Sequence, residues 1–255
     1  NHIVRDLLQH GYNVKGSVRD INDPKKIDHV KKHALDLGVP ERLEIVQGDV
    51  LEADGWSEHL TGCHGLFHTA TVYSTSGDAA MIIDTANRGT QHLFSAAKTS
   101  GIQRLVYTSS IAAVGSLPKG REKTEADWQT ERLLPYTIAK TESERLAWTL
   151  AEEMNLDLRV INPSGVLGGG FVRPTPSVEW FDDAMKGLFP AAPKIPMAFV
   201  HVVDVAVAHR KAFEIDEAQG RFILAPHNNT TISAVCRRTV SYTHLRAHET
   251  RGNLV

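Results

Sequence analysis

The sequence predicts an α/β protein built on a doubly wound parallel sheet. Short, continuously apolar segments alternate with segments of helical period, which is the pattern of repeated β-α-β units. Right-handed crossovers then place helices on both faces of the sheet. Polar residues follow several of the apolar segments, at the strand ends where sheets of this kind gather ligands. The 255 residues are enough for one large α/β unit with a sizeable core.

The individual elements follow from apolar periodicity and from capping residues. Asp23 and Pro24 suit the N-cap and the first position of a lysine-rich helix, and Gly11 suits the end of the helix before it. We expect helices up to residue 10 and over 24–37, 56–60, 79–99 and 136–154, and strands over 12–18, 43–46, 65–70, 103–107 and 158–161.

The regular alternation loosens after Gly168, where five prolines fall between residues 174 and 196. We therefore expect residues 1–168 to form the sheet domain and residues 169–239 to form mostly a smaller, loop-rich substrate region. A segment near 198–225 is expected to return to the sheet. Asp204 is expected to cap the last helix.

The composition excludes several classes of function. There are 28 basic and 30 acidic residues, so a basic nucleic-acid-binding surface is not expected. No apolar run approaches the roughly 20 residues that span a membrane. Two cysteines and thirteen scattered histidines form neither a disulfide framework nor a metal motif. We expect a cytoplasmic α/β protein that is an enzyme and needs no metal ion.

The last sixteen residues are interpreted separately. Residues 240–250 read VSYTHLRAHET and have neither helical nor strand period. This stretch resembles one reading frame of a transposase adaptor used to prepare sequencing libraries; the other interpretation is a natural disordered tail. We expect residues 240–255 to be unstructured and leave them out of the fold, so the gene-derived chain is expected to end near Thr239.

The residues with a chemical signature are Tyr136, Lys140 and Ser110. Tyr136 and Lys140 are four apart, on one face of the expected helix. An ammonium beside a phenol favours the phenolate, and such a tyrosine can exchange a proton with a carbonyl or alcohol oxygen. A surface helix pair is the other interpretation. Ser110 strengthens the first one, because it follows a strand expected to lie beside this helix.

The chain resembles the extended short-chain dehydrogenases/reductases of the NAD-dependent epimerase/dehydratase superfamily, nearest the dihydroflavonol 4-reductase and cinnamoyl-CoA reductase group. The resemblance implies a Rossmann-type dinucleotide-binding domain over residues 1–168. It also implies that Ser110, Tyr136 and Lys140 are the catalytic set, with Ser109 as the second candidate serine. The matching stretches are GYNVKGSVRD, ERLEIVQGDV, GCHGLFHTA, NRGTQHLFSAAK, RLVYTSSIAAV, PYTIAKTESERLAW, LRVINPSGVLG, FVHVVDVAVAH and GRFIL.

Arg19 follows the second strand of the family's fold, where dinucleotide-binding proteins select their cofactor. An arginine there suits a 2′-phosphate, whereas a carboxylate suits a ribose hydroxyl. The resemblance implies that Arg19 and Lys26 contact that phosphate, which predicts NADP(H). Two other interpretations stay open: Lys26 belongs to a solvated basic helix start, and Asp20 favours NAD(H).

Asp49 is expected to accept a hydrogen bond from the adenine amino group; the alternative is an Asx turn after a strand. Further cofactor contacts are implied at the ends of the other strands, in large part through backbone groups. They are Val50, Thr69, Ala70, Thr71, Ser109, Tyr136, Lys140, Pro163 and Val166.

The expected function is NADP(H)-dependent reduction of a ketone or aldehyde on a small molecule by a monomer or homodimer. Two alternatives remain: an NAD-dependent sugar-nucleotide epimerase or dehydratase, and a non-catalytic dinucleotide-binding protein. The family's first strand and Gly-rich turn would precede Asn1, and more chain would follow GRFIL. The polypeptide as printed is therefore expected to bind cofactor poorly.

Overall fold

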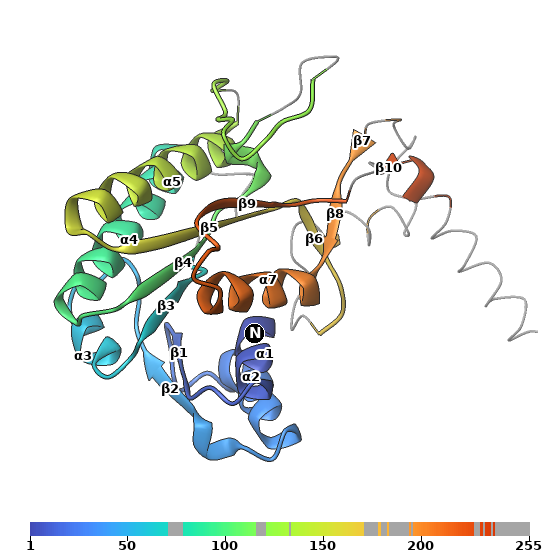
Figure 1. Cartoon of the computed structure of the whole chain (residues 1–255). Helices are drawn as coiled ribbons and strands as arrows, with labels where there is room; N and C mark the ends of the chain where they lie inside the picture. The colour runs from blue at the N-terminus through green and yellow to red at the C-terminus, as the bar shows by residue number, and fades with distance from the viewer. Residues whose placement is uncertain are drawn as a thin grey trace, which may run out of the picture.

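The structure, a computed structural model, alternates helices and strands over its first 163 residues (Figure 1). It describes residues 1–70, 79–115, 121–132, 134–170, 178–179, 183, 194, 196–226, 230–231, 233–235 and 237. The helices are α1 (His2–Gln9), α2 (Pro24–Asp36), α3 (Trp56–Leu60), α4 (Ala79–Thr99), α5 (Pro135–Met154) and α7 (Val202–Glu214), with 3₁₀ turns η1 (Pro40–Arg42) and η2 (Ile111–Ala113). The strands are β1 (Val14–Val18), β2 (Leu43–Gln47), β3 (Gly65–His68), β4 (Arg104–Thr108), β5 (Asp157–Pro163), β6 (Gly165–Leu167), β7 (Pro196–Met197), β8 (Phe199–His201), β9 (Gly220–Leu224) and β10 (Thr230–Thr231).

The largest sheet is parallel and has the strand order β3-β4-β5-β9. A second parallel ladder joins β1 to β2, and within the described residues no ladder joins β1 to β3. The alternating pattern thus yields the α/β fold with parallel strands that the sequence predicts. Among the described helices, none is long and apolar enough to cross a membrane.

Helices cover both faces of this sheet because successive strand side chains point to opposite sides. Leu105 of β4 and Val160 of β5 are fully buried against α4 and α5. Their neighbours Val106 and Ile161 pack on the other side against Ala212 of α7. Figure 1 shows α4 and α5 on one side of the sheet and α7 with α1 on the other. This packing fixes the strand ends between two rigid layers.

The N-cap residue is the predicted one in α2 and a different one in α7. Asp23 caps α2 as predicted, and its carboxylate accepts from the backbone N–H of Lys25 at 3.0 Å. Asp204 does not cap α7. His201 takes that place and its Nδ1 accepts from the N–H of Val203 at 3.3 Å. Asp204 lies in the first turn instead, where a carboxylate is favoured by the helix dipole.

The chain returns to the sheet through β9, which pairs in parallel with β5, while β6 and β8 form a separate parallel pair. Gly165 allows this approach, because a Cβ there would lie 2.8 Å from the ring of Phe199. Gly168 has φ +150, and a Cβ would lie 2.5 Å from Val202. Both glycines therefore let the chain pass closely along β8 and the start of α7. Residues 240–255 lie outside the described residues.

Candidate active site

The candidate site lies where β3, β4 and β5 end. These strands are parallel and in register, so that Tyr107 is paired with His68 on one side and Val160 on the other. Their carboxyl ends therefore meet at one edge of the sheet. Ser109 and Ser110 follow β4 directly, and the N–H of Ser109 donates to the carbonyl of Ile161 at 2.8 Å.

Ser110 begins a tight turn at this edge. Its backbone is extended, and its Oγ accepts from the N–H of Ala112 at 3.1 Å, which starts η2. A hydroxyl that accepts one bond can still donate its own proton. Ser110 is nearly buried, with 9% of its surface exposed. Its hydroxyl can therefore serve as a fixed donor toward a bound oxygen.

Tyr136 and Lys140 lie on the first two turns of α5, which packs against η2. Tyr136 is half-buried. Lys140 is only 4% exposed, and its Nζ donates to the carbonyl of Thr108 at 3.1 Å. Burial lowers the pKa of Lys140 from 10.5 to about 8, and the nearby Glu144 carboxylate opposes this change. The ammonium thus lies beside the strand that leads into Ser110.

Thr108 also ties the strand end to the opposite helix layer. Its Oγ1 lies 2.7 Å from Nε2 of His209 on α7. The other ring nitrogen, Nδ1, lies 2.7 Å from the carbonyl of Val205, so it carries the proton and Thr108 donates. Burial lowers the pKa of His209 to about 4, which keeps the ring neutral. His209 is therefore a neutral, buried residue that packs α7 against the end of β4.

Several buried polar atoms at the same edge have no hydrogen-bond partner among the described residues. They are both ring nitrogens of His68, the Oγ of Ser164 and the Oδ1 of Asn162. Burial, together with the neighbouring Lys140 cation, lowers the pKa of His68 to about 3. Unpaired buried polar atoms are costly. Of these groups, His68 is close enough to Lys140 to feel its charge, and its ring nitrogens are available to a polar ligand.

Glu144 is a site residue that the sequence reasoning missed. It is fully buried, one helical turn after Lys140 and two after Tyr136. Its carboxylate accepts from the Oγ of Ser109 at 2.5 Å and from Nε of Arg221 at 2.5 Å. The helical period that pairs Tyr136 with Lys140 extends to Glu144, so its helix face could be predicted from the sequence, but its burial and its partner Arg221 could not.

The candidate phosphate-binding residues lie on the other ladder, beyond β1. Arg19 is exposed and has no hydrogen bond or ion pair with any described residue. Asp20 is engaged locally, because its Oδ1 accepts from the N–H of Asn22 at 2.9 Å. Nζ of Lys26 lies 3.5 Å from the Asp23 carboxylate. Arg19 is therefore available to an anion, whereas Asp20 and Lys26 already have neighbours of their own.

The remaining predicted cofactor residues follow the strand ends. Asp49 forms the Asx turn considered as an alternative: its Oδ1 accepts from the N–H of Leu51 at 3.0 Å. The carbonyl of Val50 lies 2.9 Å from Nδ1 of His92. Thr69 and Ala70 are exposed directly after β3, Pro163 ends β5, Val166 lies in β6, and Thr71 lies outside the described residues.

No group of three or more His, Cys, Asp or Glu side chains among the described residues is arranged to hold a metal ion. The chemical groups that the site does offer are a phenol, an ammonium and a hydroxyl. A phenol can donate a proton, and an ammonium and a hydroxyl can donate hydrogen bonds.

Comparison with known proteins identifies the family and the fold. The family model described as the NAD dependent epimerase/dehydratase family matches residues 1–224. Cinnamoyl-CoA reductase CAD2 of Medicago truncatula is 39% identical over 237 residues, covering 87% of this chain and 71% of the relative. Tetraketide alpha-pyrone reductase 2 of Arabidopsis thaliana is 32% identical, covering 88% and 73%. The structure of Gre2 from Candida albicans in complex with NADPH aligns with a TM-score of 0.78 at 28% identity, covering 92% and 77%.

Proposed function

Because the chain belongs to the NAD-dependent epimerase/dehydratase family, as an extended short-chain dehydrogenase/reductase near the cinnamoyl-CoA reductase group, we propose that it is an NADP(H)-dependent oxidoreductase. The proposed reaction reduces a ketone or aldehyde on a small, partly apolar molecule to the alcohol. The substrate region over 169–196 falls mostly outside the described residues, so the proposal names a carbonyl class. A cytoplasmic location and a monomeric or homodimeric state belong to the same proposal.

The proposed mechanism uses three side chains around one oxygen. When bound, NADPH would supply the hydride that the carbonyl carbon receives. Ser110 donates a hydrogen bond to the carbonyl oxygen, and the phenol of Tyr136 gives its proton to the forming alkoxide. The ammonium of Lys140 favours the phenolate left on Tyr136 and holds ribose hydroxyls. In the oxidative direction each proton moves the opposite way.

The position of Lys140 is the observation that carries the proposal. A surface helix pair would leave the ammonium in water, whereas Lys140 is 4% exposed and donates to the Thr108 carbonyl at 3.1 Å. Burying an ammonium is unfavourable unless it is compensated. A buried Lys140 ammonium next to Tyr136 and the Ser110 turn therefore supports a chemical role for this lysine. The same intact pair argues against a non-catalytic dinucleotide-binding protein.

The exposed Arg19 supports NADP(H) as the cofactor. A guanidinium can bind a phosphate through two parallel charge-assisted hydrogen bonds. A free carboxylate after β1 would indicate NAD binding and so an NAD-dependent epimerase or dehydratase. The Asp20 carboxylate, however, already accepts a hydrogen bond from the backbone N–H of Asn22. Measuring which nicotinamide cofactor the purified protein binds separates the two proposals.

The test of the proposed function is Tyr136→Phe in the full-length protein. Turnover with a carbonyl substrate should fall at least about a hundredfold, the usual scale of general acid catalysis. The dissociation constant of NADPH should hardly change, because the phenol acts on substrate oxygen. Tyr12→Phe is the matched control: its hydroxyl donates to Glu214 at 2.9 Å and its loss should leave turnover intact. Near-wild-type turnover in Tyr136→Phe would overturn the assignment.

A further inference from the structure

Glu144 is a buried carboxylate to which the proposed mechanism gives no part. It is 0% exposed and lies on α5, one turn beyond Lys140. Taking a carboxylate out of water is strongly unfavourable unless several donors compensate it. Three donors do so: Oε2 accepts from Ser109 Oγ at 2.5 Å and Asn162 Nδ2 at 2.8 Å, and Oε1 accepts from Arg221 Nε at 2.5 Å.

Two of these donors hold the backbone that carries Ser110. Ser109 is its direct neighbour, so the bond to Glu144 fixes the residue before the catalytic serine. Asn162 of β5 uses the same amide group twice: Nδ2 donates to Glu144 and also to the carbonyl of Ser110 at 3.2 Å. The strand end is therefore held from the helix side and from the neighbouring strand.

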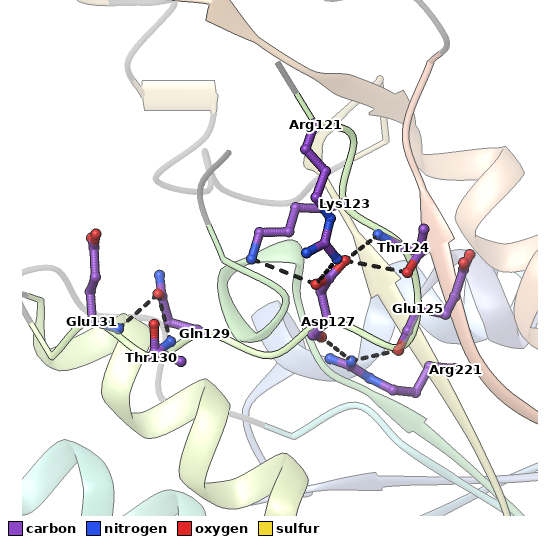
Figure 2. A network of polar contacts seen from close by, with 9 residues as sticks. All are labelled: Arg121, Lys123, Thr124, Glu125, Asp127, Gln129, Thr130, Glu131 and Arg221. Carbon is purple, nitrogen blue, oxygen red and sulfur yellow. Dashed lines mark hydrogen bonds and ion pairs between the residues drawn. The ribbon is translucent and has the colours of Figure 1, made fainter. Parts of the chain in front are cut away.

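The third donor, Arg221 of β9, connects Glu144 to the segment 121–132. Its Nη1 donates to the carbonyls of Glu125 at 2.8 Å and Asp127 at 2.5 Å (Figure 2). Its guanidinium carbon lies 3.9 Å from the centroid of the Trp128 ring, which is close enough for a cation–π contact. Only 6% of the Arg221 side chain is exposed.

That segment is in turn tied to the turn after Ser110. The N–H of Gln129 donates to the carbonyl of Ala113, the last residue of η2, at 2.8 Å. Asp127 closes the segment on itself by accepting from the N–H of Thr124 at 2.8 Å and from Arg121 (Figure 2). The Glu144–Arg221 ion pair is thus connected to the residue before Ser110 through Ser109 and to the turn after it through the segment 121–132.

We propose that Glu144 and Arg221 form a positioning pair, which fixes the Ser110 turn against α5 and sets the charge around Lys140. The inference rests on the proposed function of that site. Neither residue touches the reacting atoms, so both act through Ser110 and Lys140. A well-packed neutral pair could fill the same space at lower desolvation cost, and this is why the charges point to a role beyond packing.

The electrostatic part follows from the groups around Lys140. Glu144 faces it from its own helix and raises its pKa, while His68 from β3 stays neutral and Thr108 of β4 presents a carbonyl. Tyr136 lies one turn away. Glu144 itself is faced by Arg221 from β9 and by the Tyr107 phenol from β4. Removing the Glu144 charge should therefore make the Lys140 ammonium easier to deprotonate.

The test compares Glu144→Gln with a double variant in the full-length protein. In Glu144→Gln one amide oxygen can still accept from Ser109 and Asn162, but the amide nitrogen then faces Arg221, donor against donor. That variant is expected to lose stability because a buried cation is stranded. Glu144→Gln with Arg221→Gln removes both charges and lets the two amides bond to each other. The control is Glu142→Gln on the same helix, whose carboxylate pairs with Arg132 near the surface at 2.6 Å.

The readout is the pH dependence of kcat for reduction. At alkaline pH kcat should fall, because Tyr136 and Lys140 lose the protons that the reaction needs. In the double variant the alkaline fall in kcat should occur about one pH unit lower. One unit is the lower end of the pKa shift that a nearby opposite charge produces. The KM for substrate should change much less than kcat, and Glu142→Gln should match wild type. A double variant that is as stable as wild type and has the wild-type pH profile would overturn the positioning role. If Tyr136→Phe also kept its turnover, the proposed function itself would fail.

Discussion

Lys140→Met is expected to change how stability depends on pH. Burial lowers the pKa of Lys140 in the folded protein from 10.5 to about 8. The unfolded chain restores the ordinary value, so between pH 8 and 10.5 the unfolded state binds more protons than the folded one. Stability then rises with pH across this window. Below pH 8 the full penalty of the buried ammonium is present, and above 10.5 it is gone.

The magnitude follows from the gap between the two pKa values. One pKa unit corresponds to about 1.36 kcal/mol, so the whole penalty is about 3 kcal/mol. Between pH 7 and 9.5, about 2 kcal/mol of it should be relieved in wild type. Methionine has a similar length and no charge. The variant also loses the donor to the Thr108 carbonyl, but that loss does not depend on pH and cancels in the comparison.

The assay is urea unfolding of wild type and Lys140→Met at both pH values, with the free energy of unfolding taken from linear extrapolation. Wild type should gain about 2 kcal/mol relative to the variant on going from pH 7 to 9.5. The control is Lys98→Met, an exposed lysine in the last turn of α4, which should follow wild type. Parallel pH profiles of wild type and Lys140→Met would refute the reasoning, since they would mean that the ammonium is not desolvated.

Two further predictions concern the cofactor and the tail. Arg19→Ala should weaken NADPH binding roughly tenfold to a hundredfold, because bonds to charged groups are worth about 1.5–3 kcal/mol, and should leave NADH binding nearly unchanged. The exposed neighbour Lys25 provides the control, since Lys25→Ala removes the same charge without the planar guanidinium; equal losses for both cofactors in Arg19→Ala would mean that the arginine supports only the fold. Deleting residues 240–255 should leave the melting temperature unchanged, and a clear drop would argue against the adaptor interpretation.

The sequence was sufficient for the architecture because buried parallel strands and amphipathic helices have different periods. The helices over 24–36, 79–99 and 135–154 begin or end within a residue of the expected bounds. The strand expected from Tyr12 begins at Val14, since Tyr12 instead directs its hydroxyl to Glu214 on α7. That contact joins residues 202 positions apart, and local periodicity carries no information about it.

The site was predictable only where its chemistry is local. Tyr136 and Lys140 share one helix face, so spacing alone pairs them. The link from Glu144 to Arg221 requires the order of the strands: β9 must lie beside β5 for the guanidinium to reach α5.

A charged pair separated by 77 residues has no local signature. Each member taken alone reads as an ordinary surface residue, which is the usual place for Glu and Arg. The burial of both charges marks them, and burial is a property of the assembled sheet. In this fold the motif therefore nominates Tyr136 and Lys140 as the reacting side chains, whereas the proposed positioning residues emerge only from the pairing of β5 with β9.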